Sequence, residues 1–154
     1  MKIAIGSDHA GYEAKETIQR WLEEMGYEPV DLGTENGESV DYPDFAEEVA
    51  RYVAEDEGDR RGILVCGTGI GIGIAANKIP GIRAATCHDE FTAKMSRAHN
   101  DANVLCLGSR VLAVDRMRPI VEEFLRTEFE GGRHQRRIDK IRRLEREAAK
   151  PPPR

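Results

Sequence analysis

The stretch of sequence that decides the fold is ILVCGTGIGIGIAANK, residues 63–78. A short apolar run ends on a cysteine, and four glycines then alternate up to the start of a helical pattern. Glycine has no Cβ atom, so backbone N–H groups can approach a ligand closely, and a helix N-terminus adds the positive end of a dipole. The stretch therefore predicts a strand, an anion-binding loop and a helix in succession. The alternative is a glycine-rich turn that serves only tight packing.

Cys66 ends the predicted strand and faces this loop. A helix N-terminus favours a thiolate, and a thiolate beside hydrogen-bond donors can move a proton next to a carbonyl while the donors hold the oxyanion. A buried structural thiol is the alternative, as we expect for Cys106 within its own apolar run. Cys87 also ends a run, but no glycine loop follows it. The sequence therefore favours Cys66 as the functional cysteine.

Short strand-like runs alternate with helical patterns along the whole chain. The runs cover residues 3–6, 28–32, 62–66, 82–86 and 103–107. Such alternation predicts a parallel sheet, in which ligands bind at the carboxyl ends of the strands. We expect the turns 6–11, 66–69 and 108–110 to gather along that edge. The segment 99–101 precedes the last run, and the sequence leaves open whether it reaches the same edge.

Composition points to one globular domain, which we place at residues 1–150. The chain has 154 residues, of which 40% are hydrophobic and 33% are charged. It has no apolar stretch of transmembrane length and opens directly on a strand-like run, so we expect no signal peptide, no membrane anchor and a cytoplasmic location. Three cysteines without C-x-x-C spacing argue against a disulfide framework and a zinc site.

The C-terminal segment is basic and the rest of the chain is acidic. Residues 133–154 carry nine Lys and Arg against three Asp and Glu, a charge of +6, which leaves fourteen against twenty-five, or −11, for residues 1–132. Such a segment could bind nucleic acid, an anionic substrate or an acidic neighbouring subunit. We predict a helix over 133–149, with a narrow apolar stripe suited to a partner surface, and a disordered tail over 151–154.

Other motifs have weaker support. Gly71, Gly73 and Ala76 satisfy a dinucleotide-binding pattern, but they follow the third strand and not the first. The four histidines lack the spacing that places two imidazoles on one ion, so we expect no metal. Arg133 and Arg137 are four residues apart, so they share a helix face and could clamp a phosphate. The alternative for this charge run is a solvated face.

Several motifs together resemble the family of B-type ribose-5-phosphate isomerases, which includes allose- and galactose-6-phosphate isomerases. The resemblance spans nearly the whole chain. It rests on GSDHAG at 6–11, DYP at 41–43, CGTGIG at 66–71 with AANK at 75–78, GIRA at 81–84, HNDANVL at 99–105, GSR at 108–110 and GGRH at 131–134. It implies a Rossmann-like three-layer α/β/α sandwich with a five-stranded parallel sheet. It also implies a homodimer or homotetramer with shared sites, in which the C-terminal helix packs on a partner subunit.

The resemblance also implies roles for individual residues. Cys66 is the base that shuttles a proton between C2 and C1 of the open sugar, Thr68 and loop amides at Gly67, Gly69 and Gly71 hold the enediolate, and His99 promotes ring opening. In this resemblance Asp8 and Asn100 bind the sugar hydroxyls, and Tyr42 closes the pocket. The residues implied to bind the phosphate are Arg110, Arg133, Arg137, His9 and His134, and some of them come from the partner subunit. No metal or organic cofactor is implied.

The expected reaction is therefore the interconversion of D-ribose 5-phosphate and D-ribulose 5-phosphate in the non-oxidative pentose phosphate pathway. A six-carbon sugar phosphate, such as allose or galactose 6-phosphate, is the first alternative, because it differs by one hydroxymethylene group. The second is a non-catalytic sugar-phosphate sensor whose basic tail contacts nucleic acid. We expect the enzyme, with no nucleic-acid or membrane partner.

Overall fold

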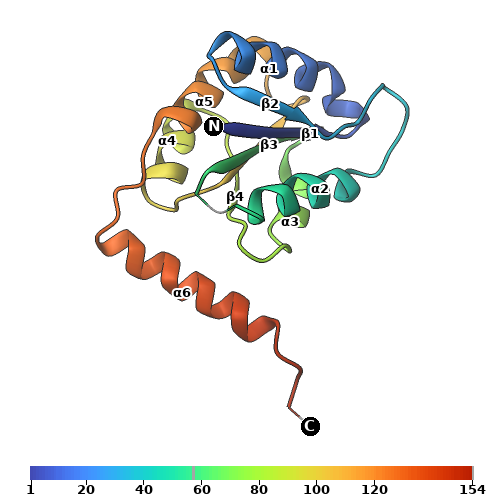
Figure 1. Cartoon of the computed structure of the whole chain (residues 1–154). Coiled ribbons are helices and arrows are strands. Elements are labelled where there is room, and N and C mark those ends of the chain that lie inside the picture. The colour runs from blue at the N-terminus through green and yellow to red at the C-terminus, as the bar shows by residue number, and fades with distance from the viewer. Residues whose placement is uncertain (57, 154) are drawn as a thin grey trace.

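The alternation of strands and helices predicted from the sequence is present in the structure of the chain, a computed structural model that describes residues 1–56 and 58–153 (Figure 1). The elements are β1 (Lys2–Ser7), η1 (His9–Gly11), α1 (Tyr12–Glu24), β2 (Glu28–Asp31), α2 (Tyr42–Ala54), β3 (Arg60–Cys66), α3 (Ile70–Ala76), β4 (Ala84–Thr86), α4 (Glu90–Ala98), β5 (Val104–Gly108), α5 (Val114–Arg126) and α6 (Arg133–Ala148). Of the predicted tail over 151–154, Arg154 lies outside the described residues.

The five strands form one parallel sheet in the order β2-β1-β3-β5-β4. The central strands β3 and β5 are apolar runs without alternation, and Ile63, Leu64 and Leu105 are fully buried. Continuous apolar strands are typical of a parallel sheet that is covered on both faces. The predicted three-layer α/β/α fold is therefore confirmed.

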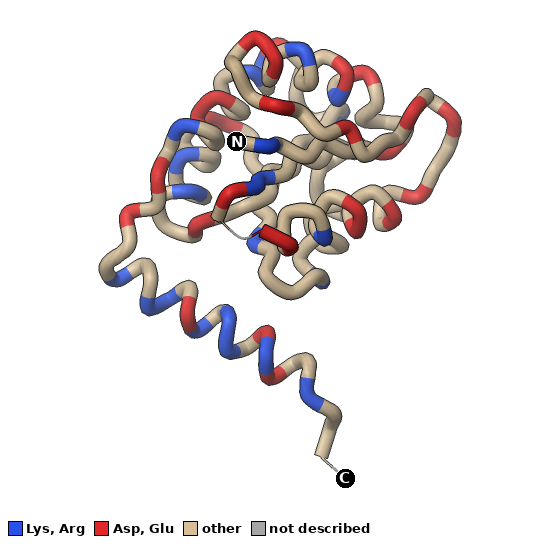
Figure 2. Tube along the Cα trace, viewed as in Figure 1, with Lys and Arg blue, Asp and Glu red and all other residues tan. Residues whose placement is uncertain are grey.

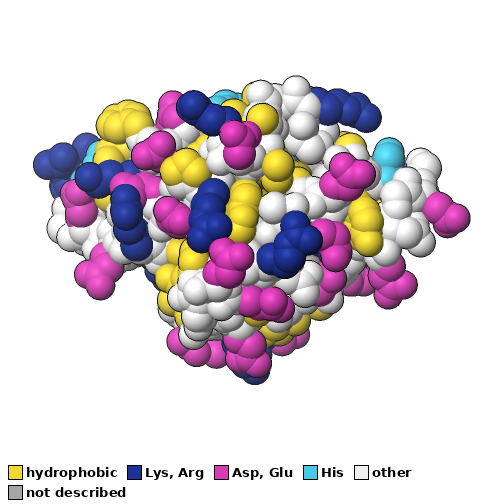
Figure 3. Space-filling model, turned by 90° about the horizontal axis from the view of Figure 1, so that it is seen from above, with side chains coloured by type: hydrophobic (Ala, Val, Ile, Leu, Met, Phe, Trp, Pro, Cys, Tyr) yellow, Lys and Arg dark blue, Asp and Glu magenta, His cyan; other side chains and the backbone are white. Residues whose placement is uncertain are grey.

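The helices cover the two faces of the sheet with separate hydrophobic cores (Figure 1). On one face α1, α4 and α5 pack around residues such as Ile18 and Phe124. On the other face α2 and α3 pack around residues such as Val49 and Ile72. Figure 3 views the molecule from above, where charged side chains of both signs are interspersed with smaller groups of hydrophobic ones. That mixture is typical of a face that meets solvent.

Gly11 lets the first turn of the fold lie directly on β3. A Cβ atom at this position would stand 2.4 Å from the carbonyl oxygen of Val65. We expect Gly11→Ala to lower the free energy of unfolding by about 1–3 kcal/mol, because the backbone of β3 must shift to accept the methyl group. Urea denaturation measures this effect. The matched control is Gly37→Ala, since a Cβ atom there meets nothing within 4 Å; equal loss in both variants would contradict the argument.

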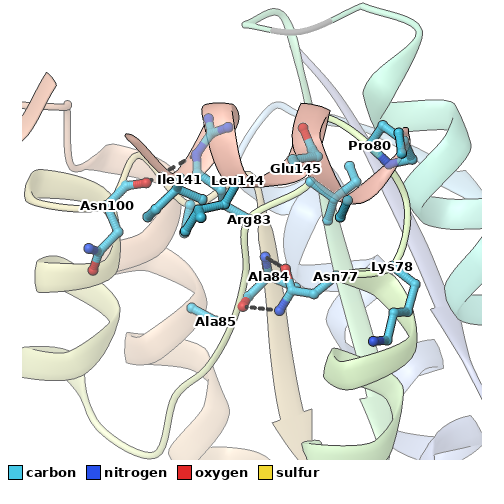
Figure 4. A pocket seen from close by; sticks show the side chains of 14 residues that line it. Asn77, Lys78, Pro80, Arg83, Ala84, Ala85, Asn100, Ile141, Leu144 and Glu145 are labelled. Atoms are coloured by element: carbon cyan, nitrogen blue, oxygen red, sulfur yellow. Dashed lines mark hydrogen bonds between the residues drawn. The ribbon is translucent and has the colours of Figure 1, made fainter. Parts of the chain in front are cut away.

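Both edges of the sheet carry a residue that limits further strand pairing. Pro29 lies within the edge strand β2 and has no N–H to donate. At the other edge, the side chain of Asn77 pairs with the backbone of Ala84 as a neighbouring strand would (Figure 4). Its Oδ1 accepts from Ala84 N at 2.8 Å, and its Nδ2 donates to Ala84 O at 3.0 Å. The start of β4 is therefore already paired.

The C-terminal helix predicted over 133–149 is present as α6, and it projects from the rest of the chain (Figure 1). Only His134 and Ile138 of this helix are buried, whereas Ile141 and Leu144 are exposed. Basic side chains predominate along it, while acidic ones are frequent on the other elements (Figure 2). A helix that buries so little is suited to a further partner. Within the described part of the chain, none of the helices has the length and apolar character needed to span a bilayer.

Candidate active site

The three turns expected to meet at the carboxyl ends of the strands do so in the structure. Ser109 joins them, because its hydroxyl donates to the carbonyl of Ala10 at 2.8 Å and its N–H donates to the carbonyl of Cys66 at 2.9 Å. The N–H of Asp8 donates to the carbonyl of Val65 at 3.3 Å. We call this edge, with residues 7–11, 66–71 and 108–110, the cradle edge.

The loop after β3 turns the thiol of Cys66 inward. Gly69 has a φ of +78°, and its N–H donates to the Sγ atom of Cys66 at 3.2 Å. The N–H of Ile70 donates to the hydroxyl of Thr68 at 3.2 Å. A side chain at Gly69 would be strained by this φ and would stand 2.9 Å from the backbone carbon of Leu107. The loop therefore holds Cys66 beside Thr68 and a row of backbone amides.

The other two cysteines are poor candidates for a base. All three cysteines are free and buried, so burial alone does not separate these two from Cys66. Burial raises the pKa of the Cys87 thiol, and burial together with the neighbouring Cys66 and Cys87 raises the pKa of the Cys106 thiol far above its usual range. A thiol that resists ionisation is a weak nucleophile and a weak base. Cys66 is the cysteine that lies in the loop.

Two side chains flank the glycines of the loop. The guanidinium of Arg110 lies over Gly67, where a Cβ atom would stand 3.4 Å from Arg110 Nη1. The ring of Tyr42 lies against Gly71, where a Cβ atom would stand 2.7 Å from Tyr42 Cζ. Tyr42 comes from the first turn of α2, and Arg110 follows β5. A cation and a phenol thus border the loop.

Asp8 and His9 lie at the end of β1 with part of their hydrogen-bonding capacity already used. The Oδ1 atom of Asp8 accepts from the N–H of Gly11 at 3.1 Å and caps the short helix η1. The Nδ1 atom of His9 accepts from the N–H of Val40 at 3.2 Å. An Nδ1 atom that accepts leaves the proton of a neutral imidazole on Nε2. His9 is therefore arranged to donate a hydrogen bond from Nε2.

The segment 99–101 does not reach the cradle edge of its own chain. Helix α4 begins after β4 and returns along the sheet, so its C-cap residue His99 lies at the start of β5. Asn100 and Asp101 follow it there. We call this side, with residues 77–83, 99–103 and helix α6, the opposite edge. The question that the sequence left open is thus answered by where α4 ends.

Helix α6 brings a second histidine onto His99. The rings of His99 and His134 stack with centroids 4.2 Å apart and an interplanar angle of 10°. Burial, then His99, then Arg133 lower the pKa of His134, which favours the neutral form of this ring. These histidines are thirty-five residues apart, so their spacing in the sequence does not predict that their rings stack.

Glu130 completes a group of three possible metal ligands with these two rings. Ligand atoms of His99, Glu130 and His134 lie within 4.8 Å of one another. The lone pairs of an imidazole lie in the plane of its ring, and nearly parallel rings do not direct them at one point. The ligand atoms of this group are therefore close together, but the imidazole lone pairs do not point at one common position as they do in a metal site.

Arg133 and Arg137 are exposed on α6, one turn apart, as predicted. One chain therefore divides the predicted site residues into two sets. The cradle edge holds Asp8, His9, Cys66, Gly67, Thr68, Gly69, Gly71 and Arg110, and Tyr42 of α2 lies against it at Gly71. The opposite edge holds His99, Asn100, Arg133, His134 and Arg137.

Asp101 fixes the segment that carries His99 and Asn100. Its φ of +47° lies in the left-handed region that favours glycine. Its carboxylate pairs with Arg97 at 2.9 Å and with Arg83 at 3.4 Å. The Nε atom of Arg83 also donates to the carbonyl of Asn100 at 3.1 Å. The role of Asp101 is not evident from the sequence, because Asp101 lies beyond the end of α4 and its second partner, Arg83, is eighteen residues away.

A cavity of about 690 Å³ lies between α6 and the rest of the opposite edge (Figure 4). Ile141 and Leu144 of α6 line one side, and Ile82 and Ala85 line the other. Asn100 lies at one end of the cavity (Figure 4). The cavity combines apolar walls with one residue of the predicted site.

The chain is similar in sequence and in overall fold to several known proteins. The family model described as Ribose/Galactose Isomerase matches residues 3–141. Ribose-5-phosphate isomerase B of Escherichia coli is 49% identical over 144 residues, which are 94% of this chain and 96% of that protein. The solved structure of ribose-5-phosphate isomerase B from Clostridium thermocellum has a TM-score of 0.94 and 54% identity, with 97% of this chain and 100% of that chain covered. That of Mycoplasma genitalium, described with bound ribulose-5-phosphate, has a TM-score of 0.92 and 48% identity, with 95% and 97% covered.

Proposed function

The chain belongs to the ribose/galactose isomerase family, and from this premise we propose that it interconverts D-ribose 5-phosphate and D-ribulose 5-phosphate. The observation that carries the proposal is the Cys66 thiol held by the loop that follows β3, with Thr68 and backbone amides around it. An aldose–ketose isomerase needs a base at C2 and C1, donors for the enediolate and a grip on the phosphate. We place the enzyme in the cytoplasm, in the non-oxidative pentose phosphate pathway.

Cys66 acts as the base in this proposal. Its thiolate takes the proton from C2 of the open-chain aldose, the electrons form the C1–C2 double bond, and the carbonyl oxygen at C1 gains negative charge. Thr68 and amides of the loop stabilise that enediolate by hydrogen bonds. The proton of the C2 hydroxyl passes to the oxygen at C1, the thiol returns its proton to carbon C1, and C2 becomes the carbonyl of the ketose while C1 becomes a hydroxymethyl group. No step needs an oxidant or a metal ion.

A second copy of the chain completes each site. His99, which would open the furanose ring, and Asn100 lie at the edge opposite to Cys66 in their own chain. We propose that the cradle edge of one protomer packs against the opposite edge and α6 of its partner. The charge of +6 on residues 133–154 and of −11 on residues 1–132 favours contact between α6 and the acidic remainder of a second copy. Apolar side chains are exposed on both sides of it, namely Ile70 and Ile74 of α3 and Ile141 and Leu144 of α6.

The phosphate of the substrate would then be held from both protomers. Arg110 and His9 lie at the cradle edge, and Arg133 and Arg137 of the partner's α6 provide two guanidiniums on one helix face. His134 adds a neutral donor. A guanidinium presents a planar fork of donors that suits phosphate oxygens. Binding energy from this remote group would position the reacting carbons.

Turnover of ribose 5-phosphate by the purified protein in excess chelator tests the proposed function. We expect metal-independent formation of ribulose 5-phosphate, with lower kcat/KM on allose 6-phosphate and galactose 6-phosphate run in parallel. A preference for either hexose phosphate would assign the sister activity within the family. Absence of turnover on all three, together with salt-dependent binding to duplex DNA, would favour the sensor.

We expect Asp101→Asn to lower kcat/KM for ribose 5-phosphate by about 10–100-fold, because the segment that carries His99 loses an ionic anchor and small displacements are costly. The loss should be smaller for the enzyme-catalysed exchange of a C1 hydrogen of ribulose 5-phosphate with deuterated water, because this exchange needs the base but no ring opening. This ketose has no furanose ring to open, since the hydroxyl that would close the ring carries the phosphate. Asp115→Asn, at an exposed position, is the matched control. An equal loss in turnover and in hydrogen exchange would indicate a general structural defect instead.

A further inference from the structure

Thr86, the last residue of β4, packs against the loop that carries Cys66. Its hydroxyl donates to the backbone carbonyl of Gly69 at 2.9 Å. Thr86 is the register partner of Cys106 on the neighbouring strand β5, so this hydroxyl is carried by the sheet itself and not by another loop. A strand of the sheet thus holds the backbone of the cradle loop at one point.

Two glycines make room for the side chain of Thr86. A Cβ atom at Gly69 would stand 3.1 Å from Thr86 Cγ2, and a Cβ atom at Gly73 would stand 3.0 Å from Thr86 Oγ1. Carbon atoms in favourable contact are about 3.5–4.0 Å apart, so a side chain at either glycine would crowd Thr86. Gly73, which matches a dinucleotide-binding pattern in the sequence, therefore has a different physical role, because it lets Thr86 pack closely on the first turn of α3.

The peptide between Gly69 and Ile70 is held at both of its polar ends by threonine hydroxyls. Its carbonyl oxygen accepts from Thr86 at 2.9 Å, and its N–H donates to the Oγ1 atom of Thr68 at 3.2 Å. The same carbonyl also accepts from the N–H of Gly73, at the longer distance of 3.3 Å. A peptide group is planar, so it cannot rotate without breaking hydrogen bonds at both ends.

The orientation of this peptide affects two groups that the proposed mechanism uses. Thr68 accepts the N–H of Ile70, and accepting a hydrogen bond does not use the hydrogen of its own hydroxyl, so Thr68 can still donate to an enediolate oxygen. On the other side of the Gly69 Cα atom, the N–H of Gly69 donates to Cys66 Sγ at 3.2 Å. A hydrogen bond to sulfur favours the thiolate. Rotation of the peptide would disturb both groups together.

We propose that Thr86 is a positioning residue of the isomerase site. By holding the carbonyl of Gly69, it keeps the N–H of Gly69 on the thiol of Cys66 and keeps the hydroxyl of Thr68 aligned for the enediolate. The inference rests on the proposed function, because it takes Cys66 as the base and Thr68 as a donor. Its effect on rate comes from alignment, since preorganised donors act only when they face the position where charge develops.

Thr86→Val and Thr86→Ser separate the hydroxyl of Thr86 from its methyl group. Valine keeps the branched shape of threonine but cannot donate, whereas serine keeps the donor. We expect Thr86→Val to lower kcat for ribose 5-phosphate by about 10–100-fold at unchanged KM, because alignment is lost at the reacting carbons while the phosphate is held elsewhere. Thr86→Ser should stay close to the wild type. Thr17→Val is the matched control, since the hydroxyl of Thr17 donates to a backbone carbonyl within α1 at 3.2 Å.

The thiolate of Cys66 gives a second readout, which needs no turnover. Its ultraviolet absorbance is the difference between each protein and the same protein with Cys66→Ala, compared at the pH where the wild type shows half of its full signal. We expect a weaker signal in Thr86→Val, because the N–H of Gly69 no longer faces the sulfur. Thr86→Ser and Thr17→Val should match the wild type.

The two proposals fail in different ways in these experiments. If the wild type turns over no sugar phosphate, the proposed function fails, and the thiolate signal still shows whether Thr86 holds the loop on Cys66. If the wild type is active, three results overturn the role of Thr86: an unchanged kcat in Thr86→Val, an unchanged thiolate signal in that variant, or an equal loss in Thr86→Ser. Should Thr86→Val fail to fold, Thr86→Ala is compared with Thr86→Ser in its place.

Discussion

Cys66→Ala is expected to lower turnover of ribose 5-phosphate by about 10²–10⁴-fold, the range that a positioned general base contributes. The thiol lies at the end of β3, 3.2 Å from the N–H of Gly69. In the described part of the cradle edge, no other cysteine is available to replace it. Exchange of the substrate's C2 hydrogen with deuterated water should fall in parallel, because the same thiolate removes that hydrogen.

Two variants separate the chemistry from the packing. Cys66→Ser keeps the size of the side chain and an acceptor for the N–H of Gly69, yet a serine hydroxyl is a much weaker acid than a thiol, so we expect a comparable loss. Cys87→Ala removes a buried thiol outside the cradle loop and should retain most of the activity. Thermal unfolding shows whether each variant is folded. Near-normal turnover in folded Cys66→Ala would falsify the assignment of the base.

Mixing two inactive variants should restore activity if each site uses both protomers. The first variant is Cys66→Ala, and the second combines His99→Ala with Arg137→Ala. Random reassembly makes half of the dimers mixed, and each mixed dimer has one intact site of two, so we expect about a quarter of the wild-type specific activity. The measurement is turnover of ribose 5-phosphate after the variants are unfolded together and refolded.

The matched control for this experiment pairs two changes at the same edge. Cys66→Ala and Thr68→Ala both alter the loop after β3, so a mixed dimer has one defect in each site and no intact site. We expect no recovery from this mixture. Recovery in both mixtures, or in neither, would contradict the shared site, because only a site split between protomers distinguishes the two pairs.

The local parts of the fold could be predicted from the sequence. The apolar run 63–66 and the glycines that follow it indicate a strand, a loop and a helix, and the structure has them in that order. Alternation of strand and helix also indicated that the turns after β1, β3 and β5 meet at one edge. These features depend on neighbouring residues and on the general behaviour of parallel sheets. Such rules act within short windows of sequence.

The opposite edge could not be predicted in the same way. Whether His99 lies near Cys66 depends on where α4 ends relative to the sheet, which is a matter of helix length and packing. The stacking of His134 on His99 depends on how α6 docks. A small cavity of about 160 Å³ at this edge is lined by residues from positions 58 to 142, so no spacing in the sequence predicts it. Contacts of this kind arise from tertiary packing, and the hydrophobic pattern of each element says little about them.

The residues that block the two edges of the sheet affect how copies of this chain associate. Aggregates and fibrils commonly grow when the exposed edge of one sheet recruits a strand from another molecule. Here Pro29 withholds a donor at one edge, and the amide of Asn77 occupies the first residue of β4 at the other. Recruitment by strand addition is thereby disfavoured on both sides. Association between copies is left to side chains of the helices and loops, such as the exposed Ile141 and Leu144 of α6.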